Sequence, residues 1–471
     1  MNSTKSSPFS YPSPVRAWTT VSILSFTYMF SFIDRQILVL LIEPIKADLQ
    51  ISDTQVSLLT GFAFAIMYTL SGIPMGRAAD GWVRKYVIIF GVAMWSLLTM
   101  ACGFARTFTH LFVARMGVGF GEAALTPTAY AMMPDLFPPN KLAKGMSVFA
   151  LGSSMGAGLS LLFGGMVIGL ATKMGPISLP LIGDIQPWQL VLLTVGAASL
   201  LMIIPLSLMP EPKRQDANVE KKQSDLKTTL TYLRDHRAFY GYFFVGIALY
   251  ALFIYGIMTW LPSYFIRVHQ WQAAETGIIL GTLTIVPSII GTLSAGWLSD
   301  YLYAKGYRGA PLYMAITALV LSIPMTLVII YVPLMTAKLI TLVLLFFTLT
   351  VLGVIPPTVT QMVTPARIRG QVSAFYLLIV NLIGIGGGPT VIALITDHVF
   401  QNELALGHSI AIVAVLTCGV GAVLLWLSVA PFKQQLDQVD GDCRGEPQKS
   451  HSEQSPSTEL DTLTLIKSYE T

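Results

Sequence analysis

Long runs of apolar residues, separated by short polar stretches, dominate the chain. Each run holds about twenty residues, the length that an α-helix needs to cross the hydrocarbon core of a bilayer. The first six runs lie near 17–41, 55–75, 87–105, 109–133, 145–170 and 188–209. After a polar stretch, six more lie near 239–264, 275–298, 311–331, 338–361, 370–395 and 409–430. This pattern predicts an all-α membrane protein with twelve transmembrane helices in two pseudo-symmetric six-helix bundles.

The same pattern divides the chain into five parts. They are a cytoplasmic N-terminal tail at 1–16, a first bundle at 17–210, a linker at 211–237, a second bundle at 238–431 and a cytoplasmic tail at 432–471. In the linker, Leu226, Leu230 and Leu233 recur on one helical face, which predicts a short helix on the membrane surface. The last part is rich in Gln, Ser, Asp and Glu without periodicity, which predicts disorder.

Composition excludes several classes of protein. Hydrophobic residues make up 54% of the chain and charged residues only 11%, whereas a soluble domain carries about a quarter charged residues. The three cysteines have no metal-ligand or redox spacing, and no phosphate-binding motif of an ATP-driven pump is present. We therefore expect no metal, no cofactor and no enzymatic activity.

The distribution of basic residues predicts the orientation. With both termini in the cytoplasm, about 22 of the 29 Lys and Arg residues lie on the cytoplasmic side of the membrane. The opposite orientation would reverse this bias, so we expect a multi-pass protein of the cell inner (plasma) membrane. Basic residues are scattered among loops without interleaved aromatic residues, so nucleic acid is not an expected partner.

A weak internal repeat links the two predicted bundles. The loop after the second span contains Gly76-x-x-x-Asp80 followed by Arg84 and Lys85, and the loop after the eighth contains Gly296-x-x-x-Asp300 followed by further basic residues. The pattern therefore occupies the same topological position in each bundle. It favours a duplicated transporter architecture.

These residues resemble the loop signature of the major facilitator superfamily. Gly81 and Val83 depart from the basic residue and the glycine that this signature usually has. Within the superfamily, the segments Phe32–Leu38, Glu43–Leu49 and Ala114–Ala123 resemble the bacterial spinster-type branch. The resemblance implies ion-coupled movement of lipid-like or other organic solutes.

Four ionisable residues lie well inside the predicted spans, namely Asp34, Arg35, Arg115 and Glu122. A charge near the bilayer centre costs at least about 2.5 to 3.5 kcal/mol, so such a group normally faces a partner or a water-filled pathway. A structural ion pair that only holds two helices together is the alternative. The second bundle offers no such charge, so we expect it to contribute aromatic and polar groups.

The spacing of these four residues limits how they pair. Asp34 and Arg35 point about 100° apart on a helix, so each needs another partner. Arg115 matches the depth of Asp34, and we expect these two to pair; neutralising Asp34 would then free Arg115 for an anionic group. Glu122 follows Arg115 by two helical turns and has no basic neighbour in its own helix. We expect Glu122 and Asp34 to carry protons, and the spinster resemblance implies coupling at the same four positions.

The remaining candidates belong to a cavity and to a gate. In the second bundle the cavity candidates are Tyr250, Tyr255, Trp260, Gln361, Tyr376 and Asn381, although for each aromatic one packing or lipid contact is the favoured explanation. The cytoplasmic gate candidates are Gly76, Asp80, Arg84, Lys85, Asp135 and Asp300. We expect Asp80 near the helix start at Gly370 and Asp135 paired with Arg84. A solvated loop that follows the charge bias is the alternative.

Together these features predict a monomeric secondary active transporter that works by alternating access. We expect proton movement through Asp34 and Glu122 to be coupled to an organic solute held by Arg35 or Arg115. A charged half facing an apolar half suits an amphiphile, such as a lysolipid or a sphingosine-phosphate-like lipid. A small hydrophilic organic anion, such as a sugar acid or an aromatic acid, is the alternative.

Overall fold

The computed structural model describes residues 11–179, 183–212, 214, 226–365 and 368–444. In this part of the chain, eleven helical segments are long and apolar enough to cross a membrane. The expected span near 109–133 is the twelfth, and it is divided into α6 (Phe108–Glu122) and α7 (Leu125–Leu136). The prediction of an all-α membrane protein with twelve crossings is confirmed.

The N-terminal half contains five spans in addition to the one formed by α6 and α7. Its other elements are α1 (Pro14–Leu40), α2 (Ile42–Leu49), α3 (Asp53–Ser57), the π-helical turn η1 (Leu58–Phe62), α4 (Ala63–Gly81), α5 (Arg84–Cys102), α8 (Pro139–Met174), β1 (Ile177–Leu179), β2 (Gly183–Ile185), α9 (Pro187–Leu200) and α10 (Ile203–Leu208). The two short strands pair antiparallel between α8 and α9. Sequence periodicity did not predict this hairpin because each strand has only three residues.

The C-terminal half begins with a short helix and continues with six spans. Its elements are α11 (Leu226–Asp235), α12 (Arg237–His269), α13 (Ala273–Ala304), α14 (Ala310–Tyr331), α15 (Met335–Leu349), α16 (Val351–Val363), α17 (Arg369–Ile379), η2 (Val380–Gly387), α18 (Gly388–Leu394), η3 (Ile395–Phe400), η4 (Glu403–Ala405), α19 (Leu406–Val413), η5 (Ala414–Cys418) and α20 (Gly419–Arg444). The turns η2, η3 and η5 are π-helical, so the last two spans are α-helices with wider turns inserted.

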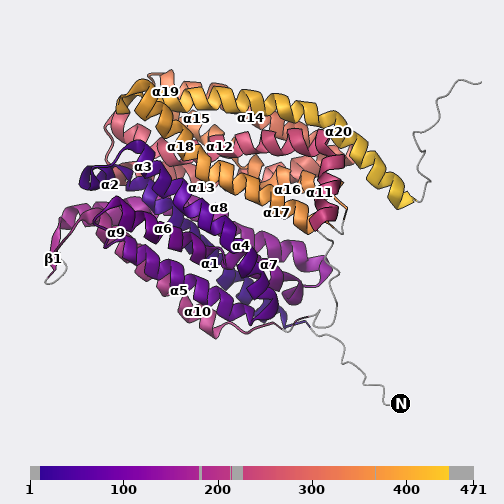
Figure 1. Ribbon diagram of the computed structural model, residues 1–471, viewed down its shortest axis with the longest axis horizontal. Helices are drawn as coiled ribbons and strands as arrows, with labels where there is room; N and C mark the ends of the chain where they lie inside the picture. The colour runs from indigo at the N-terminus through magenta and orange to yellow at the C-terminus, as the bar shows by residue number, and fades with distance from the viewer. Residues whose placement is uncertain (1–10, 180–182, 213, 215–225, 366–367, 445–471) are drawn as a thin grey trace, which may run out of the picture.

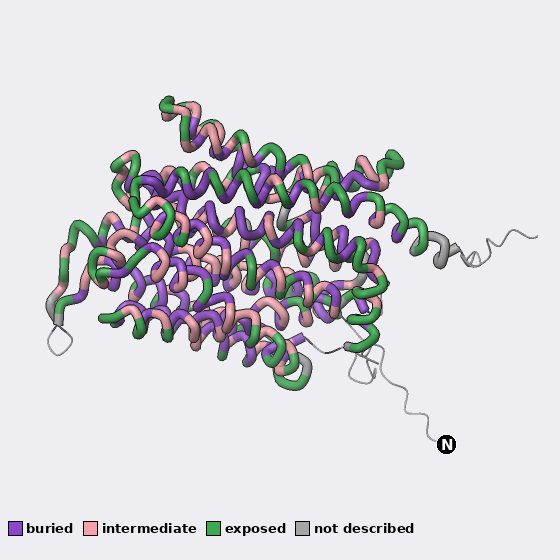
Figure 2. Tube along the Cα trace, turned by 45° about the horizontal axis from the view of Figure 1, so that its top comes forward, coloured by how far each residue is buried: buried purple, intermediate pink, exposed green. Residues whose placement is uncertain are grey.

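The two halves form two layers, with the N-terminal half drawn in indigo to magenta and the C-terminal half in rose through orange to yellow (Figure 1). The hairpin β1–β2, α2 and α3 lie at one end of the molecule, which we call the hairpin end. The start of α1, the helix α11 and the end of α20 lie at the opposite end, which we call the linker end. Buried and exposed stretches alternate along the helices, as expected where one face of each helix packs on its neighbours (Figure 2).

Two segments near the linker end differ from the sequence expectations. The predicted short helix is present as α11, but Leu230 on its expected apolar face is exposed. This helix instead docks through Thr229, which donates to Gln371 Oε1, and through Tyr232, whose hydroxyl donates to the Val363 carbonyl at 3.1 Å. Helix α20 continues beyond the expected start of the tail, because Phe432 and Leu436 are buried against the C-terminal half. Residues 445–471 of the expected tail lie outside the described part.

Glycine allows α5 and α6 to pack at backbone contact. A Cβ atom at Gly121 of α6 would lie 2.6 Å from the Trp95 nitrogen and 2.9 Å from the Gly91 carbonyl oxygen of α5. These neighbours are backbone atoms, so they can make room only if the two helices move apart. The packing matters for function because α6 also carries Arg115 and Glu122.

We expect Gly121→Ala to destabilise the N-terminal half by about 1 to 3 kcal/mol, the usual cost of overpacking. The measurement is the apparent Tm of the purified protein in detergent. Gly241→Ala on α12 is the matched control, because a Cβ atom there meets nothing within 4 Å. Both changes add the same helix propensity. Equal Tm values for the two variants would contradict the tight contact.

Candidate functional site

A buried ion pair joins α1 to α6 inside the N-terminal half. Arg35 Nη2 donates to Glu122 Oε2 at 2.7 Å, and Ser31 Oγ donates to the same oxygen at 2.7 Å. The Glu122 side chain is fully buried and that of Arg35 is 12% exposed. Sequence reasoning noted that Glu122 has no basic neighbour in its own helix. The structure supplies that neighbour from α1, because Arg35 and Glu122 reach the same depth.

Asp34 occupies a different position in the same cluster. Its side chain is fully buried, and among the described residues neither carboxylate oxygen has a hydrogen-bond donor. Trp95 of α5 and Ser199 of α9 lie beside it, and their own polar atoms lack partners as well. Arg115 is an electrostatic neighbour of Asp34 but does not reach ion-pair distance. The expected Asp34–Arg115 pair is therefore not formed, and Arg35–Glu122 is the direct pair.

Aromatic rings surround the guanidinium group of Arg35. Its Cζ atom lies 4.4 Å from the ring centre of Phe64, 4.9 Å from that of Phe32 and 5.2 Å from that of Tyr68. Arg115 approaches Phe64 from its own helix, with its Cζ atom 5.7 Å from the ring centre. These distances are within the range of cation–π attraction. The cluster thus holds two cations between aromatic faces and leaves Arg35 with a single carboxylate partner.

Two of the predicted cavity residues extend from the C-terminal half toward this cluster. Tyr255 of α12 is an electrostatic neighbour of Arg35 and Tyr68, and Tyr376 of α17 neighbours Tyr255. Tyr28 of α1 adds a third tyrosine hydroxyl close to Arg35. The phenol groups therefore continue from the N-terminal charges to the facing half.

The other predicted cavity residues lie elsewhere. Tyr250 and Trp260 are fully buried in the C-terminal half, where the Tyr250 hydroxyl donates to the Thr348 carbonyl at 3.2 Å and Trp260 Nε1 donates to the Pro389 carbonyl at 2.9 Å. Gln361 is exposed on α16, and Asn381 is half-buried in η2. Geometry thus separates Tyr255 and Tyr376, which approach the charges, from residues that pack within one half.

The predicted gate residues gather at the linker end. Arg84 forms the expected ion pair with Asp135, which joins α5 to α7. Glu211 accepts from the backbone nitrogens of Arg84 and Lys85, both at 3.0 Å, and so caps the start of α5. Asp300 is exposed on α13, and a Cβ atom at Gly76 would meet nothing within 4 Å. The surroundings of Asp80 and Gly370 lie outside what the structure describes, so their expected proximity stays a prediction.

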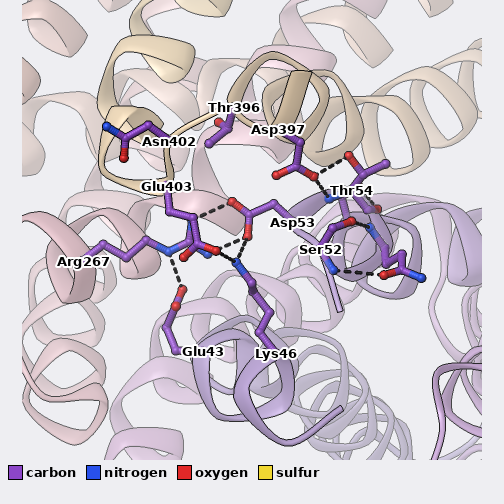
Figure 3. A network of polar contacts seen from close by, with 12 residues as sticks. Glu43, Lys46, Ser52, Asp53, Thr54, Arg267, Thr396, Asp397, Asn402 and Glu403 are labelled. Atoms are coloured by element: carbon purple, nitrogen blue, oxygen red, sulfur yellow. Dashed lines mark hydrogen bonds and ion pairs between the residues drawn. The ribbon is translucent and has the colours of Figure 1, made fainter. Parts of the chain in front are cut away.

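A network of ion pairs joins the two halves at the hairpin end (Figure 3). Arg267, near the end of α12, donates from Nη1 and Nη2 to the two carboxylate oxygens of Asp53 at 2.6 and 2.7 Å. Its Nε donates to Glu43 Oε1 at 2.9 Å. Asp53 begins α3 and Glu43 belongs to α2, so one arginine ties two N-terminal elements to a C-terminal helix. Bidentate pairs of this kind are among the strongest polar contacts in proteins.

Further polar contacts extend this network. Lys46 Nζ donates to Asp53 Oδ1 at 2.5 Å and to Glu403 Oε1 at 2.8 Å. The hydroxyl and the backbone nitrogen of Thr54 both donate to Asp397 Oδ2 at 2.7 Å. We name these residues the hairpin-end latch: Glu43, Lys46, Asp53, Thr54, Arg267, Asp397 and Glu403. The latch closes the hairpin end of the interface between the halves.

Sequence reasoning missed the latch because its charges lie near the ends of spans, where charges are ordinary. Glu43 and Lys46 occur in the segment Glu43–Leu49, which carries the spinster resemblance, but sequence reasoning assigned them no partners. The expectation that the second bundle has no intramembrane charge is wrong at this end. Arg267 and Lys338 lie within spanning helices and are only 7% and 3% exposed.

The site has no arrangement suited to a metal. Among the described residues, no three His, Cys, Asp or Glu side chains come together as a metal site would require. The cluster instead combines exchangeable ion pairs with aromatic walls. That combination can bind an anionic group and exchange a proton.

Comparison with known proteins agrees with this architecture. The sequence profile of the Major Facilitator Superfamily matches residues 24–389. An MFS-type efflux pump of Mycolicibacterium smegmatis is 26% identical, over 90% of this chain and 95% of its own. The hexuronate transporter of Bacillus subtilis is 27% identical, over 82% and 90%. The sphingosine-1-phosphate transporter of Danio rerio is 25% identical, over 81% and 76%.

A solved structure has the same fold. It is a bacterial homologue of the human lysosomal transporter spinster in an inward-facing and occupied conformation, with a TM-score of 0.71 and 25% sequence identity over 90% of this chain and 97% of that one. Two six-helix halves, the first of which holds a buried charged cluster, form a multi-pass membrane transporter. This chain belongs to the major facilitator superfamily and is a transporter of the spinster type.

We expect Arg267→Ala to open the hairpin end. Removing one partner of a buried pair costs up to about 3 to 5 kcal/mol, and Lys46, which also pairs with Asp53, offsets part of that cost. The measurement is the distance distribution between spin labels on α2 and α12, by double electron–electron resonance. A longer-distance population should appear in the variant.

Arg308→Ala serves as the control for this experiment. Arg308 pairs with Asp437 within the C-terminal half, and both side chains are exposed, so the pair contributes at most about 1 kcal/mol. Its distance distribution should match the wild type. If Arg267→Ala also matched the wild type, the latch would not hold the halves together.

Proposed function

We propose that this protein is a proton-coupled transporter that moves an organic amphiphile through a central cavity by alternating access. The observation that carries the proposal is the buried Arg35–Glu122 ion pair at 2.7 Å, walled by aromatic rings and facing tyrosines of the other half. The same residues serve in binding and in coupling. Proton coupling and the substrate follow from the chemistry of this pair.

Glu122 and Asp34 are the proposed proton carriers. A proton on Glu122 removes the negative charge that holds Arg35, so the guanidinium group becomes available to an anionic substrate group. Loss of that proton restores the pair and releases the anion. Asp34 is buried without a hydrogen-bond donor among the described residues, and burying an ionised carboxylate in this way is costly. Proton binding relieves that cost, which assigns Asp34 as the second site, with Arg115 as its electrostatic neighbour.

An amphiphile fits the asymmetry of the site. Its anionic head would bind Arg35, and its apolar body would lie against Tyr255 and Tyr376 of the C-terminal half. The similarity to a sphingosine-1-phosphate transporter supports a lipid-like substrate, such as a lysolipid. The similarity to a hexuronate transporter supports the alternative, a small hydrophilic anion taken up with protons. The aromatic walls favour the amphiphile.

The orientation and the gates belong to the same proposal. We place the linker end in the cytoplasm, with both termini there and the protein in the inner membrane as a monomer, because most of the 29 Lys and Arg residues then face the cytoplasm. The hairpin-end latch is then the closed outer gate of an inward-facing state. Arg84, Lys85 and Asp135, with Gly76, Asp80 and Asp300, are assigned to the cytoplasmic gate. The first three parts of the chain keep the bounds inferred from the sequence, and α20 extends the second bundle to Arg444.

We expect the purified protein to take up or release protons when its substrate is added. Glu122→Gln should abolish this signal and Asp34→Asn should reduce it, because each replaces a protonatable carboxyl by an amide of similar shape. The measurement is the pH change in a weakly buffered detergent solution as candidate lysolipids and sugar acids are added.

Glu275→Gln is the control, since it removes an exposed carboxylate from α13 that belongs to neither the cluster nor a gate. It should keep the full proton signal. If Glu122→Gln and Asp34→Asn both kept the signal and still bound the solute, the carboxylates would be structural. The proton mechanism would then be lost, while the transporter fold would remain.

We expect Tyr255→Ala to weaken binding of a lysophospholipid by about tenfold, the loss that one aromatic contact explains. The measurement is isothermal titration calorimetry with lysophosphatidylethanolamine and with glucuronate. Tyr331→Ala, at an exposed tyrosine of α14, should leave the affinity unchanged. Tight binding of glucuronate with no binding of the lysolipid would establish the hydrophilic alternative instead.

A further inference from the structure

A second cavity lies in the C-terminal half, away from the charge cluster. It has a volume of about 670 Å³ and lies between α13, α14 and α15. Its deep end is formed by Gly291, Leu321 and Phe347, and its mouth by Lys305 and Tyr307. None of the proposed coupling residues contributes to it. The volume is within the range of small-molecule sites.

The shape of this cavity matches a lipid tail. From Gly291 to Lys305 it follows α13 for about 21 Å, given 1.5 Å per residue. One leaflet supplies about half of the 40 to 45 Å that a bilayer measures with its head groups, so the cavity runs the depth of a leaflet and reaches its head-group region. The side chains of Leu298, Leu321 and Phe347 line it and are exposed, which opens it sideways toward the surrounding membrane.

The mouth of the cavity carries positive charge and tyrosines. Lys305 Nζ lies 4.6 Å from the ring centre of Tyr301, and Tyr301 lines the cavity. Lys433 Nζ of α20 donates to the hydroxyl of Tyr313, another lining residue, at 3.4 Å. Neither lysine has a carboxylate partner in the described part of the chain.

Among the described residues, the acidic groups near the mouth form no ion pair with either lysine. Asp437 is paired with Arg308, and Asp300 is exposed on α13. Trp297 stacks on Tyr301, with ring centres 5.4 Å apart, and is itself largely exposed. Aromatic residues of this kind gather at the level of lipid head groups. The mouth therefore lies at head-group level and is complementary to a negative charge.

We propose that this cavity binds an anionic phospholipid of the surrounding leaflet. One acyl chain fills the space between α13, α14 and α15, and the phosphate lies between Lys305 and Lys433. The site is separate from the central cluster and does not depend on which solute is transported. The bound lipid would give the lipid-facing surface of the C-terminal half a fixed contact with the membrane.

The test is native mass spectrometry of the delipidated full-length protein with phosphatidylglycerol and with phosphatidylcholine of the same acyl chains. Wild type should bind phosphatidylglycerol more tightly. Lys305→Gln with Lys433→Gln should weaken phosphatidylglycerol binding by about fivefold for each lysine, the contribution of one basic residue near a charged lipid surface. Phosphatidylcholine binding should not change.

Two matched controls separate charge from cavity. Lys144→Gln with Lys173→Gln removes the same charge at exposed positions of the N-terminal half and should have no effect. Thr317→Phe fills the cavity and should reduce binding of both lipids at least tenfold. Thr282→Phe should not, although both threonines are exposed and bond the backbone within their helix.

Several outcomes would overturn the proposal. Equal retention of the two lipids by wild type would mean unselective contact with the bilayer. Unchanged binding in both the paired lysine variant and Thr317→Phe would place the lipid elsewhere. A dimer that Thr317→Phe abolishes would place a second copy of the chain in the cavity. The lysine variants alter only exposed side chains, so they remain informative even if Thr317→Phe fails to fold.

Discussion

The ion pair between Arg35 and Glu122 lies within helices that cross a membrane, where an isolated charge costs at least about 2.5 to 3.5 kcal/mol. Each charge offsets the cost of burying the other, and Ser31 also donates a hydrogen bond to the Glu122 oxygen that Arg35 contacts. The geometry of the N-terminal half serves this contact. Helices α5 and α6 meet at glycine, which sets the position of α6 and therefore brings Glu122 to Arg35.

A second set of ion pairs has the opposite relation to movement. The latch around Arg267 and Asp53 joins the halves, so any opening of the hairpin end has to break it. Lys46 and Glu403 add a second ion pair to the latch. Glu403 is largely exposed, so part of the latch is accessible to water. Water can replace those contacts as they open. A buried bidentate pair next to a hydrated one gives a closed state that is stable and still reversible.

The length of the apolar runs predicted the spans because membrane crossing depends on length and composition. The prediction failed only at helix ends and breaks, which composition does not determine. The fourth span divides after Glu122, and α20 continues past Phe432, because local packing decides both. The four buried charges were found from depth, but their pairing was not. Asp34 and Arg35 point about 100° apart on α1, and the rotation of α1 about its axis, which the sequence does not specify, turns Arg35 toward Glu122.

The placement of Arg35 and Glu122 in one half has a consequence for the energy of transport. If the partners belonged to different halves, each transition would separate a buried pair at a cost of about 3 to 5 kcal/mol. Because α1 and α6 belong to the same half, a rocking movement of one half against the other leaves the pair intact. The tyrosines of the C-terminal half then move relative to an Arg35–Glu122 pair whose own geometry does not change. In the proposed mechanism, a proton on Glu122 or an anion at Arg35 is what changes the pair, and opening of the latch accompanies the movement of the halves.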